Sequence, residues 1–294
     1  MKYYSGTTDF ASDSPSAVTL GKFDGMHRGH QKLFQRVRSQ AGLNRTAFMI
    51  APDEAPCLLT KEEKKKKLQE WDFDTVIDCP YIPEVLSMTP EIFIEKILVG
   101  RLKVRYIAVG SDFRFGRGRR GDASSLVRLQ EKYGYHIDVI EKEKYNGREI
   151  SSTYVKEAVQ AGQMELAGSL LGFPYPVLGE VMHGRQLGRR LGMPTINLVP
   201  DQRKILPPSG VYFTRVRTGD GTFKGVTNVG YKPTVDGSFL GVETYLYDFN
   251  EDLYGKEAEV YFEHYRRPEQ KFSDLEALKT QMFRDLAAGR EFFA

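Results

Sequence analysis

Two histidines, His27 and His30, lie in the segment GKFDGMHRGH at residues 21–30, directly after an apolar run at residues 17–20. The glycines of this segment allow the backbone to turn sharply and to approach a ligand closely. A helix that begins near His27 would point free backbone N–H groups at an anion such as phosphate. Two imidazoles there can donate hydrogen bonds to phosphate oxygens and stabilise a transferring nucleotidyl group without a covalent intermediate. The alternative is a chance histidine pair at a solvated helix start, and the position after a strand favours the functional interpretation.

A second glycine-rich segment, HGRQLGRRLGMPTINL at residues 183–198, also has the composition of a phosphate site. The chain has no GxxxxGK[ST] phosphate loop, so nucleotide binding here needs another scaffold. Thr195 and Asn197 are two residues apart, so on an extended segment their oxygens face the same way and can share one Mg²⁺ with nucleotide phosphates. Read without further context, the TIN stretch is more often an ordinary strand fragment. The glycines that would form the backbone cradle are Gly184, Gly188 and Gly192.

The first half of the chain alternates between two periodicities. Segments with helical spacing, such as HQKLFQRVRSQ and PEIFIEKILVGRL, separate short apolar runs, and in the second of them Ile92, Phe93, Ile97 and Leu98 share one predicted face. This order predicts a Rossmann-like α/β domain whose parallel sheet binds ligands at the carboxyl ends of its strands. The runs expected to be strands are 17–20, 46–50, 75–77, 106–109 and 136–140.

From about residue 175 the pattern changes to short segments rich in Val, Tyr, Phe and Thr with turn residues between them. These segments predict a small antiparallel β-barrel, and a terminal helix follows with Ser273 and Glu276 as its capping box. The connecting stretch predicts one or two helices that end at Gly172. We therefore expect two domains, 1–172 and 173–294.

Composition limits the classes of protein that fit. The chain of 294 residues has a net charge of +3, which suits anionic small molecules and is too small to argue for nucleic-acid binding. It has no apolar run of membrane-spanning length and no apolar signal segment, and Cys57 and Cys79 form no metal or CxxC spacing. A reduced, cytoplasmic protein without membrane partners is expected. The lysine-rich run TKEEKKKKLQEW, with the capping box of Thr60 and Glu63, is interpreted as a solvated helix face.

The first segment resembles the HxGH signature of the nucleotidyltransferases, in the form found in bacterial bifunctional riboflavin kinase/FAD synthetases. The resemblance covers nearly the whole chain. The matching segments, in the order of that family, are VGSDFRFGRGRRGD, REISSTYVK, VMHGRQLGRRLGMPTINL, GVYF, TNVGYKPT, VETYLYDFNEDLYG and RRPEQKF. The resemblance implies phosphorylation of riboflavin to FMN in the second domain. Adenylylation of FMN to FAD with release of pyrophosphate would follow in the first, with ATP as co-substrate and Mg²⁺ at both sites.

In the first domain the resemblance assigns His27 and His30 to the ATP phosphates and the transition state. It also implies flavin contacts in the basic loop after residue 111, with a merely solvated loop as the alternative. The remaining nucleotide residues it implies are Gly21, Phe23, Asp24, Gly25, Gly29, Ser152, Thr153 and Lys156, and the flavin residues are Asp112, Phe113 and Arg114.

Two positions depart from the pattern of the family. Lys156 stands where arginine is common, so it keeps the charge but loses the bidentate fork. Asp112 stands where asparagine is frequent, and a carboxylate beside a flavin phosphate is unfavourable unless it meets a cation.

In the second domain the resemblance assigns Thr195 and Asn197 to Mg²⁺ and Glu243 to the catalytic base for the 5′-hydroxyl of riboflavin. Glu243 would share one strand face with Tyr245, and without the resemblance it reads as a surface glutamate. Arg267 is expected to help hold the flavin.

The expected partners are riboflavin, FMN and ATP, with no nucleic acid and no membrane, and the chain is expected to be a monomer or a weak homo-oligomer. The alternatives are a riboflavin kinase with an inactive adenylyltransferase domain, a nucleotidyltransferase for another acceptor, and a flavin- or RNA-binding regulator.

Overall fold

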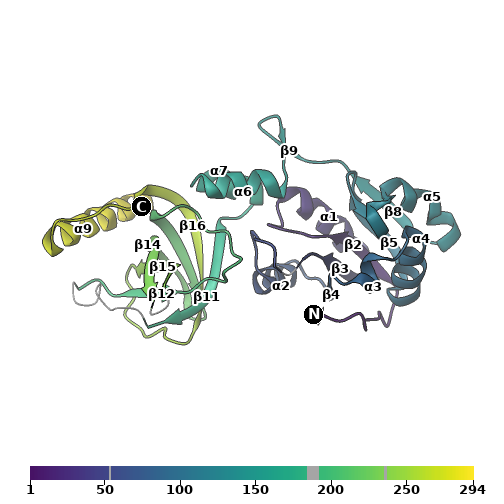
Figure 1. Cartoon of the computed structure of the whole chain (residues 1–294), viewed down its shortest axis with the longest axis horizontal. Helices are drawn as coiled ribbons and strands as arrows, with labels where there is room; N and C mark the ends of the chain where they lie inside the picture. The colour runs from purple at the N-terminus through teal and green to yellow at the C-terminus, as the bar shows by residue number, and fades with distance from the viewer. Residues whose placement is uncertain (53, 184–191, 235–236) are drawn as a thin grey trace. The chain divides into compact units, whose positions relative to one another are not determined.

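The computed structural model describes residues 1–52, 54–183, 192–234 and 237–294. It divides into two compact units, Met1–Ser152 and Thr153–Ala294, which are treated separately (Figure 1). Among the helices of the described residues, none has the length and apolar character needed to cross a bilayer.

The first unit is built on a six-stranded, all-parallel sheet in the order β1-β4-β3-β2-β5-β8, as the alternating pattern predicts. The five expected runs are all strands. A sixth strand, β1, lies at the edge of the sheet, and the sequence analysis missed it because four residues, two exposed and two half-buried, give too short a pattern. The strands are β1 (Lys2–Ser5), β2 (Ser16–Gly21), β3 (Asn44–Ile50), β4 (Thr75–Cys79), β5 (Val104–Gly110) and β8 (His136–Ile140).

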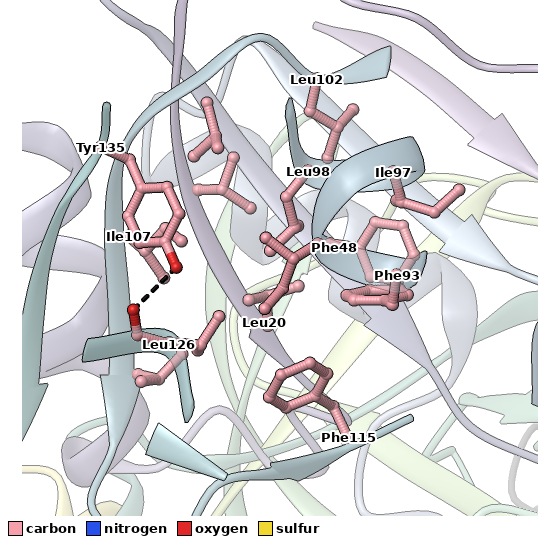
Figure 2. Close-up of a cluster of buried hydrophobic side chains, with 14 of the residues drawn as sticks. Leu20, Phe48, Phe93, Ile97, Leu98, Leu102, Ile107, Phe115, Leu126 and Tyr135 are labelled. Atoms are coloured by element: carbon pink, nitrogen blue, oxygen red, sulfur yellow. Dashed lines mark hydrogen bonds between the residues drawn. The ribbon is translucent and has the colours of Figure 1, made fainter. Parts of the chain in front are cut away.

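One face of this sheet packs against η1 (Phe93–Arg101) and α5 (Ala123–Tyr133) in a continuous apolar cluster. Figure 2 shows Leu20 and Phe48 of the sheet among Phe93, Leu98 and Leu126, with the hydroxyl of Tyr135 donating to the Leu126 carbonyl at 2.7 Å. Side chains alternate along a strand, so Ala17 and Thr19 face the opposite side, where α1 (Arg28–Arg38) packs on β2 and β5. Small residues on that face leave room for the helix.

The expectation that Ile92 belongs to the buried face of its helix is wrong. Ile92 ends α4 (Pro90–Ile92) and is 40% exposed, whereas Ile94 is fully buried. The chain continues as a π-helix, η1, whose wider turn brings Phe93, Ile97 and Leu98 onto the sheet at spacings of four and five.

Shorter elements complete the first unit. The lysine-rich segment forms α2 with the predicted capping box. The backbone N–H of Glu63 donates to the hydroxyl of Thr60 at 3.2 Å, and the backbone N–H of Thr60 donates to the carboxylate of Glu63 at 2.8 Å. These elements are α2 (Lys61–Glu70), α3 (Pro83–Leu86), β6 (Arg114–Phe115), η2 (Arg117–Arg119), β7 (Gly121–Asp122), β9 (Lys144–Tyr145) and β10 (Arg148–Glu149).

The boundary between the units falls at the first residue of α6 (Ser152–Gln160), which is followed by α7 (Met164–Leu171); these are the two helices expected of the connecting stretch. Gly172 ends α7 in the left-handed conformation with φ 79°, as predicted. A closed antiparallel barrel follows in the order β11-β12-β15-β14-β13-β16. Its strands are β11 (Tyr175–Met182), β12 (Thr195–Leu198), β13 (Gly210–Thr218), β14 (Gly221–Thr234), β15 (Gly237–Leu246) and β16 (Glu257–Pro268).

A row of buried threonines crosses the barrel wall. Thr227 on β14 lies 2.7 Å from the hydroxyl of Thr214 on β13 and 2.8 Å from that of Thr244 on β15. Each hydroxyl is therefore satisfied inside the barrel, where an unpaired one would be costly.

The terminal helix α9 (Leu275–Phe292) packs on the outside of the barrel. The predicted capping box of Ser273 is wrong: Asp274 is the N-cap, and its carboxylate accepts from the backbone N–H of Ala277 at 2.8 Å. Ser273 instead donates to the carboxylate of Asp274. A carboxylate is the stronger acceptor for a free helix N–H, which explains the displacement by one residue.

Candidate active sites

The segment after β2 forms a strained loop at the carboxyl end of a central strand. Phe23 and Met26 both have φ 47° although neither is glycine, and Gly25 has φ 83°. The side chains of Phe23 and Met26 are 1% exposed, so burial holds them in a conformation that most residues avoid. The loop is thus fixed by packing.

Two glycines are needed for the close packing in this loop. A Cβ at Gly21 would lie 2.7 Å from the ring of Phe23, and one at Gly29 would lie 3.2 Å from the ring of His27. The first separation is too short for any Cβ, so residue 21 must be glycine for Phe23 to keep its place.

His27 and His30 stack on each other with ring centroids 3.8 Å apart and an interplanar angle of 18°. The ring of Phe23 meets His30 edge-on at 5.3 Å. The Nδ1 atoms of both histidines are buried and have no hydrogen-bond partner within the described part of the chain. A buried ring nitrogen without a partner is energetically costly, so these two positions are candidates for a ligand contact.

Burial sets the charge of this pair. Desolvation lowers the pKa of His27 to about 4, although Asp24 and two other carboxylates oppose the shift. Desolvation, and next the charge of His27, lower the pKa of His30 well below its ordinary value. Both imidazoles are therefore neutral near pH 7, and they can donate hydrogen bonds to phosphate but carry no positive charge.

Two distant segments fix the loop through Asp24. The backbone N–H of Leu58 donates to its carboxylate at 2.7 Å, and the hydroxyl of Ser152 donates to its carbonyl at 2.7 Å. The helix α6 begins at Ser152, so the HxGH segment meets the matching segment REISSTYVK across 128 residues of sequence. Thr153 and Lys156 lie in the first two turns of α6 and belong to the second unit.

The carboxylate of Asp112 forms an ion pair with the ammonium of Lys142. Lys142 Nζ lies 3.0 Å from Asp112 and 3.1 Å from Glu149, and hydrogen bonds to both raise the pKa of Lys142. This ammonium is shared by two carboxylates, so it offsets the negative charge of Asp112 only in part. Lys142 gave no signal in the sequence, because it lies thirty residues from Asp112 and becomes a neighbour only when β5 pairs with β8.

The other expected flavin residues of this unit have partners within their own hairpin. Phe113 stacks on Phe115 with centroids 5.5 Å apart, and Arg114 forms a 2.7 Å ion pair with Asp122. The carboxylate of Asp122 also caps α5 through the backbone N–H of Ser125 at 2.8 Å. The backbone of this loop is therefore held in place, and its other arginines, 117, 119 and 120, are exposed.

In the barrel, β12 and β15 place the expected kinase residues on one face. Asn197 pairs with Glu243 in the register, and the hydroxyl of Thr195 donates to Glu243 Oε1 at 2.8 Å. The alternate residues Ile196 and Leu198 are buried, so Thr195 and Asn197 share the other face, as predicted. Two neutral oxygen donors and one carboxylate meet here, a set that suits Mg²⁺.

The sequence analysis missed Asn228, which continues this polar row onto β14. It pairs with Glu243 on the side opposite Asn197, and its amide donates to Glu269 at 3.3 Å. Glu269 lies so close to the backbone of Gly230 that a Cβ there would collide with it. The signal was present in the matching segments TNVG and RRPEQKF, but only strand register shows which residues meet.

Arg267 has a structural partner. Its guanidinium makes a two-pronged ion pair with Asp285 of α9, with a shortest distance of 2.6 Å and both side chains largely buried. The contact seen in the structure therefore anchors α9, and the flavin contact stays a prediction. Gly192 has φ 77°, which favours glycine, whereas Gly184 and Gly188 lie outside the described residues.

No group of three or more histidine, cysteine, aspartate or glutamate side chains suitable for a metal occurs within the described residues. Within the described residues neither cysteine forms a disulfide, and Cys57 is half-buried whereas Cys79 is buried.

The first unit has a histidine loop at the strand ends of a parallel sheet, and the second has a Thr-Asn-Glu face on a closed barrel. Together these features are those of a two-domain enzyme that transfers phosphoryl and nucleotidyl groups from nucleotides. Comparison with known families supports both halves. The FAD synthetase family matches residues 9–154 and the riboflavin kinase family matches residues 171–293.

Related proteins match over both domains. The bifunctional riboflavin kinase/FMN adenylyltransferase of Escherichia coli K12 is 38% identical over 289 residues, which cover 94% of this chain and 92% of the relative. The protein of that name from Haemophilus influenzae is 33% identical and covers 94% of each chain. A crystal structure described as a macrolide-efflux protein from Streptococcus pneumoniae is 28% identical, has a TM-score of 0.85 and covers 98% of both chains. That description belongs to the S. pneumoniae protein, and the likeness supports the same two-domain fold here.

The chain belongs to the bifunctional riboflavin kinase/FMN adenylyltransferase family. It is a transferase that forms FMN from riboflavin and FAD from FMN with ATP, and a kinase-only protein is not favoured.

Proposed function

We propose that His27 and His30 carry the adenylyl transfer to FMN. In this step a phosphate oxygen of FMN attacks the α-phosphorus of ATP, and the α–β P–O bond breaks with its electron pair leaving on pyrophosphate. Neutral, partnerless imidazole nitrogens at the end of a central strand can donate hydrogen bonds to the oxygens whose charge grows in this transition state. No proton needs to leave either histidine. The stacked pair is the observation that carries this assignment.

Riboflavin phosphorylation is assigned to the face of β12 and β15. Glu243 accepts the proton of the 5′-hydroxyl as that oxygen attacks the γ-phosphorus, and ADP leaves. Thr195 orients the carboxylate through its 2.8 Å hydrogen bond. A hydroxyl that donates one bond keeps two lone pairs, so Thr195 and Asn197 would hold Mg²⁺, which neutralises phosphate charge when bound.

The flavin and remaining nucleotide contacts follow the family resemblance. We propose that Asp112, Phe113 and Arg114 line the FMN site and that Lys156 contributes charge to the phosphates. Arg267 is placed near the flavin of the kinase domain, with Gly184, Gly188 and Gly192 as the phosphate cradle. Domain limits of 1–172 and 173–294, a cytoplasmic location and a monomeric or weakly associating state complete the proposal.

Complementary variants test the residue assignment. Wild-type protein with riboflavin and MgATP is expected to give FMN and then FAD on chromatography. Glu243→Gln should lose FMN formation by about 10²-fold or more and still convert supplied FMN to FAD. The double variant His27→Ala, His30→Ala should accumulate FMN without FAD. If Glu243→Gln failed to convert supplied FMN to FAD, or the double variant formed no FMN, while the circular dichroism stayed native, the division of roles would be wrong.

A further inference from the structure

The two histidines cannot neutralise the negative charge of the phosphates at the adenylyl-transfer site. The polyphosphate of ATP carries several negative charges, and the departing pyrophosphate gains another as the α–β bond breaks. His27 and His30 are neutral near pH 7, so they offer hydrogen bonds but no net positive charge. Lys156 is proposed above to contribute one positive charge, and any further cation has to come from another part of the site.

Several basic side chains near the loop are already occupied by carboxylates of the chain. Arg28 forms an ion pair with Glu143, and Lys32 lies 3.3 Å from the same carboxyl group. Lys142 is shared between two carboxylates, as described above. Lys61, at the start of α2, lies 2.8 Å from Asp78. The charges of these groups are largely balanced before a ligand arrives.

The lysine-rich run supplies a different kind of cation. The expectation that this run is a solvated face is wrong in part, because Glu63 and Lys67 are buried. Lys64, in the second turn of α2, is half-buried, and its ammonium donates to the backbone carbonyl of Lys22 at 3.2 Å. That contact is to an uncharged oxygen and uses one of three N–H donors.

The position of Lys64 is next to the histidine pair. It donates to the loop that leads from β2 to His27, and its charge contributes to lowering the pKa of His30. Burial lowers the pKa of Lys64 itself, against the attraction of Asp24 and then of Cys57 and Asp78. An incompletely solvated ammonium beside an anion site gains more from a phosphate than one in water does.

We propose that Lys64 binds the polyphosphate of ATP at the adenylyl-transfer site and stabilises the charge on the pyrophosphate as it leaves. This inference rests on the assignment of that reaction to His27 and His30. It gives a role to a basic run that the sequence suggested was only a solvated helix face.

The test compares Lys64→Met with Lys64→Arg in the full-length protein, because methionine keeps the apolar stem and arginine keeps the charge. The readouts are FMN-to-FAD conversion and the reverse reaction of FAD with pyrophosphate. Lys64→Met is expected to raise KM for both ATP and pyrophosphate about tenfold or more, which corresponds to the loss of one charge-assisted contact. Lys64→Arg should stay close to wild type.

Two controls separate this inference from its premise and from misfolding. Lys65→Met removes the adjacent, exposed lysine, whose ammonium lies over the Tyr3 ring, and it should leave both KM values unchanged. Riboflavin phosphorylation by each variant provides an internal measure of intact protein. If wild type made no FAD, the assigned reaction itself would fail. If Lys64→Met kept wild-type KM values for ATP and pyrophosphate, whether or not kcat fell, Lys64 would not bind the polyphosphate.

Discussion

The neutral state of His27 has a measurable consequence for stability. Burial lowers the folded-state pKa of His27 to about 4, whereas an unfolded histidine has a pKa near 6.5. As the pH falls below 6.5, the unfolded chain takes up the proton first, so the contribution of His27 to stability is complete above 6.5 and is lost as the pH approaches 4. Integrating the proton uptake gives about 2 kcal/mol of lost stability between pH 8 and pH 5 for this one residue.

The single tryptophan provides the assay. Trp71 ends α2 in the first unit, with its ring 5.7 Å from Phe34 and 5.6 Å from the guanidinium of Arg38. Urea unfolding followed by its fluorescence therefore reports on the unit that contains His27. Wild type and His27→Gln are compared at pH 8, 7, 6 and 5. The unfolding free energy of wild type, measured relative to that of His27→Gln, should fall by about 2 kcal/mol between pH 8 and pH 5.

A histidine elsewhere in the same unit serves as the matched control. His136 lies on β8 with its side chain 68% exposed, and His136→Gln removes an imidazole without touching the loop. It should not reproduce the flattening of the pH profile that is expected for His27→Gln. Parallel unfolding profiles for wild type and His27→Gln from pH 8 to pH 5 would refute the conclusion that burial keeps His27 neutral, and with it the hydrogen-bond role proposed for the pair.

Three further substitutions test the two sites. Gly21→Ala places a Cβ 2.7 Å from the ring of Phe23, so adenylyl transfer should fall by about 10²-fold with FMN formation kept, and retained FAD synthesis would contradict the packing argument. Thr195→Val removes the hydroxyl that holds Glu243, and the rate of FMN formation should drop about tenfold or more while FAD formation from supplied FMN is unchanged. Asp285→Asn weakens the buried ion pair of Arg267, so thermal unfolding of the barrel should begin several degrees lower, and an unchanged unfolding temperature would show that the pair does not anchor α9.

The architecture was largely predictable because both halves of the chain have clear periodicity. Buried parallel strands are continuous apolar runs, and barrel strands alternate, so each class of element has its own pattern. The two wrong predictions, for Ile92 and Ser273, occur where a second local preference overrides the one used for the prediction. Ile92 was misplaced because the π-helix changes the spacing of buried positions, and Ser273 lost its place as cap to the stronger acceptor at Asp274.

The candidate site residues were found from motifs, but their partners were not. Lys142 beside Asp112, Asn228 beside Glu243 and Lys64 beside the histidine loop are each far in sequence from the group they serve. Strand register and helix packing bring such pairs together, and neither quantity is encoded in local spacing.

The sequence by itself determined which groups are present and which local turns are possible: two imidazoles three apart, glycines where no side chain fits, and a threonine and an asparagine on one strand face. Only the tertiary structure decided their chemical state. Burial of the loop lowers the pKa of both histidines, and contacts from α2 and Ser152 fix the backbone that carries them. Solvation and charge depend on every atom packed around a group, and most of those atoms come from distant parts of the chain.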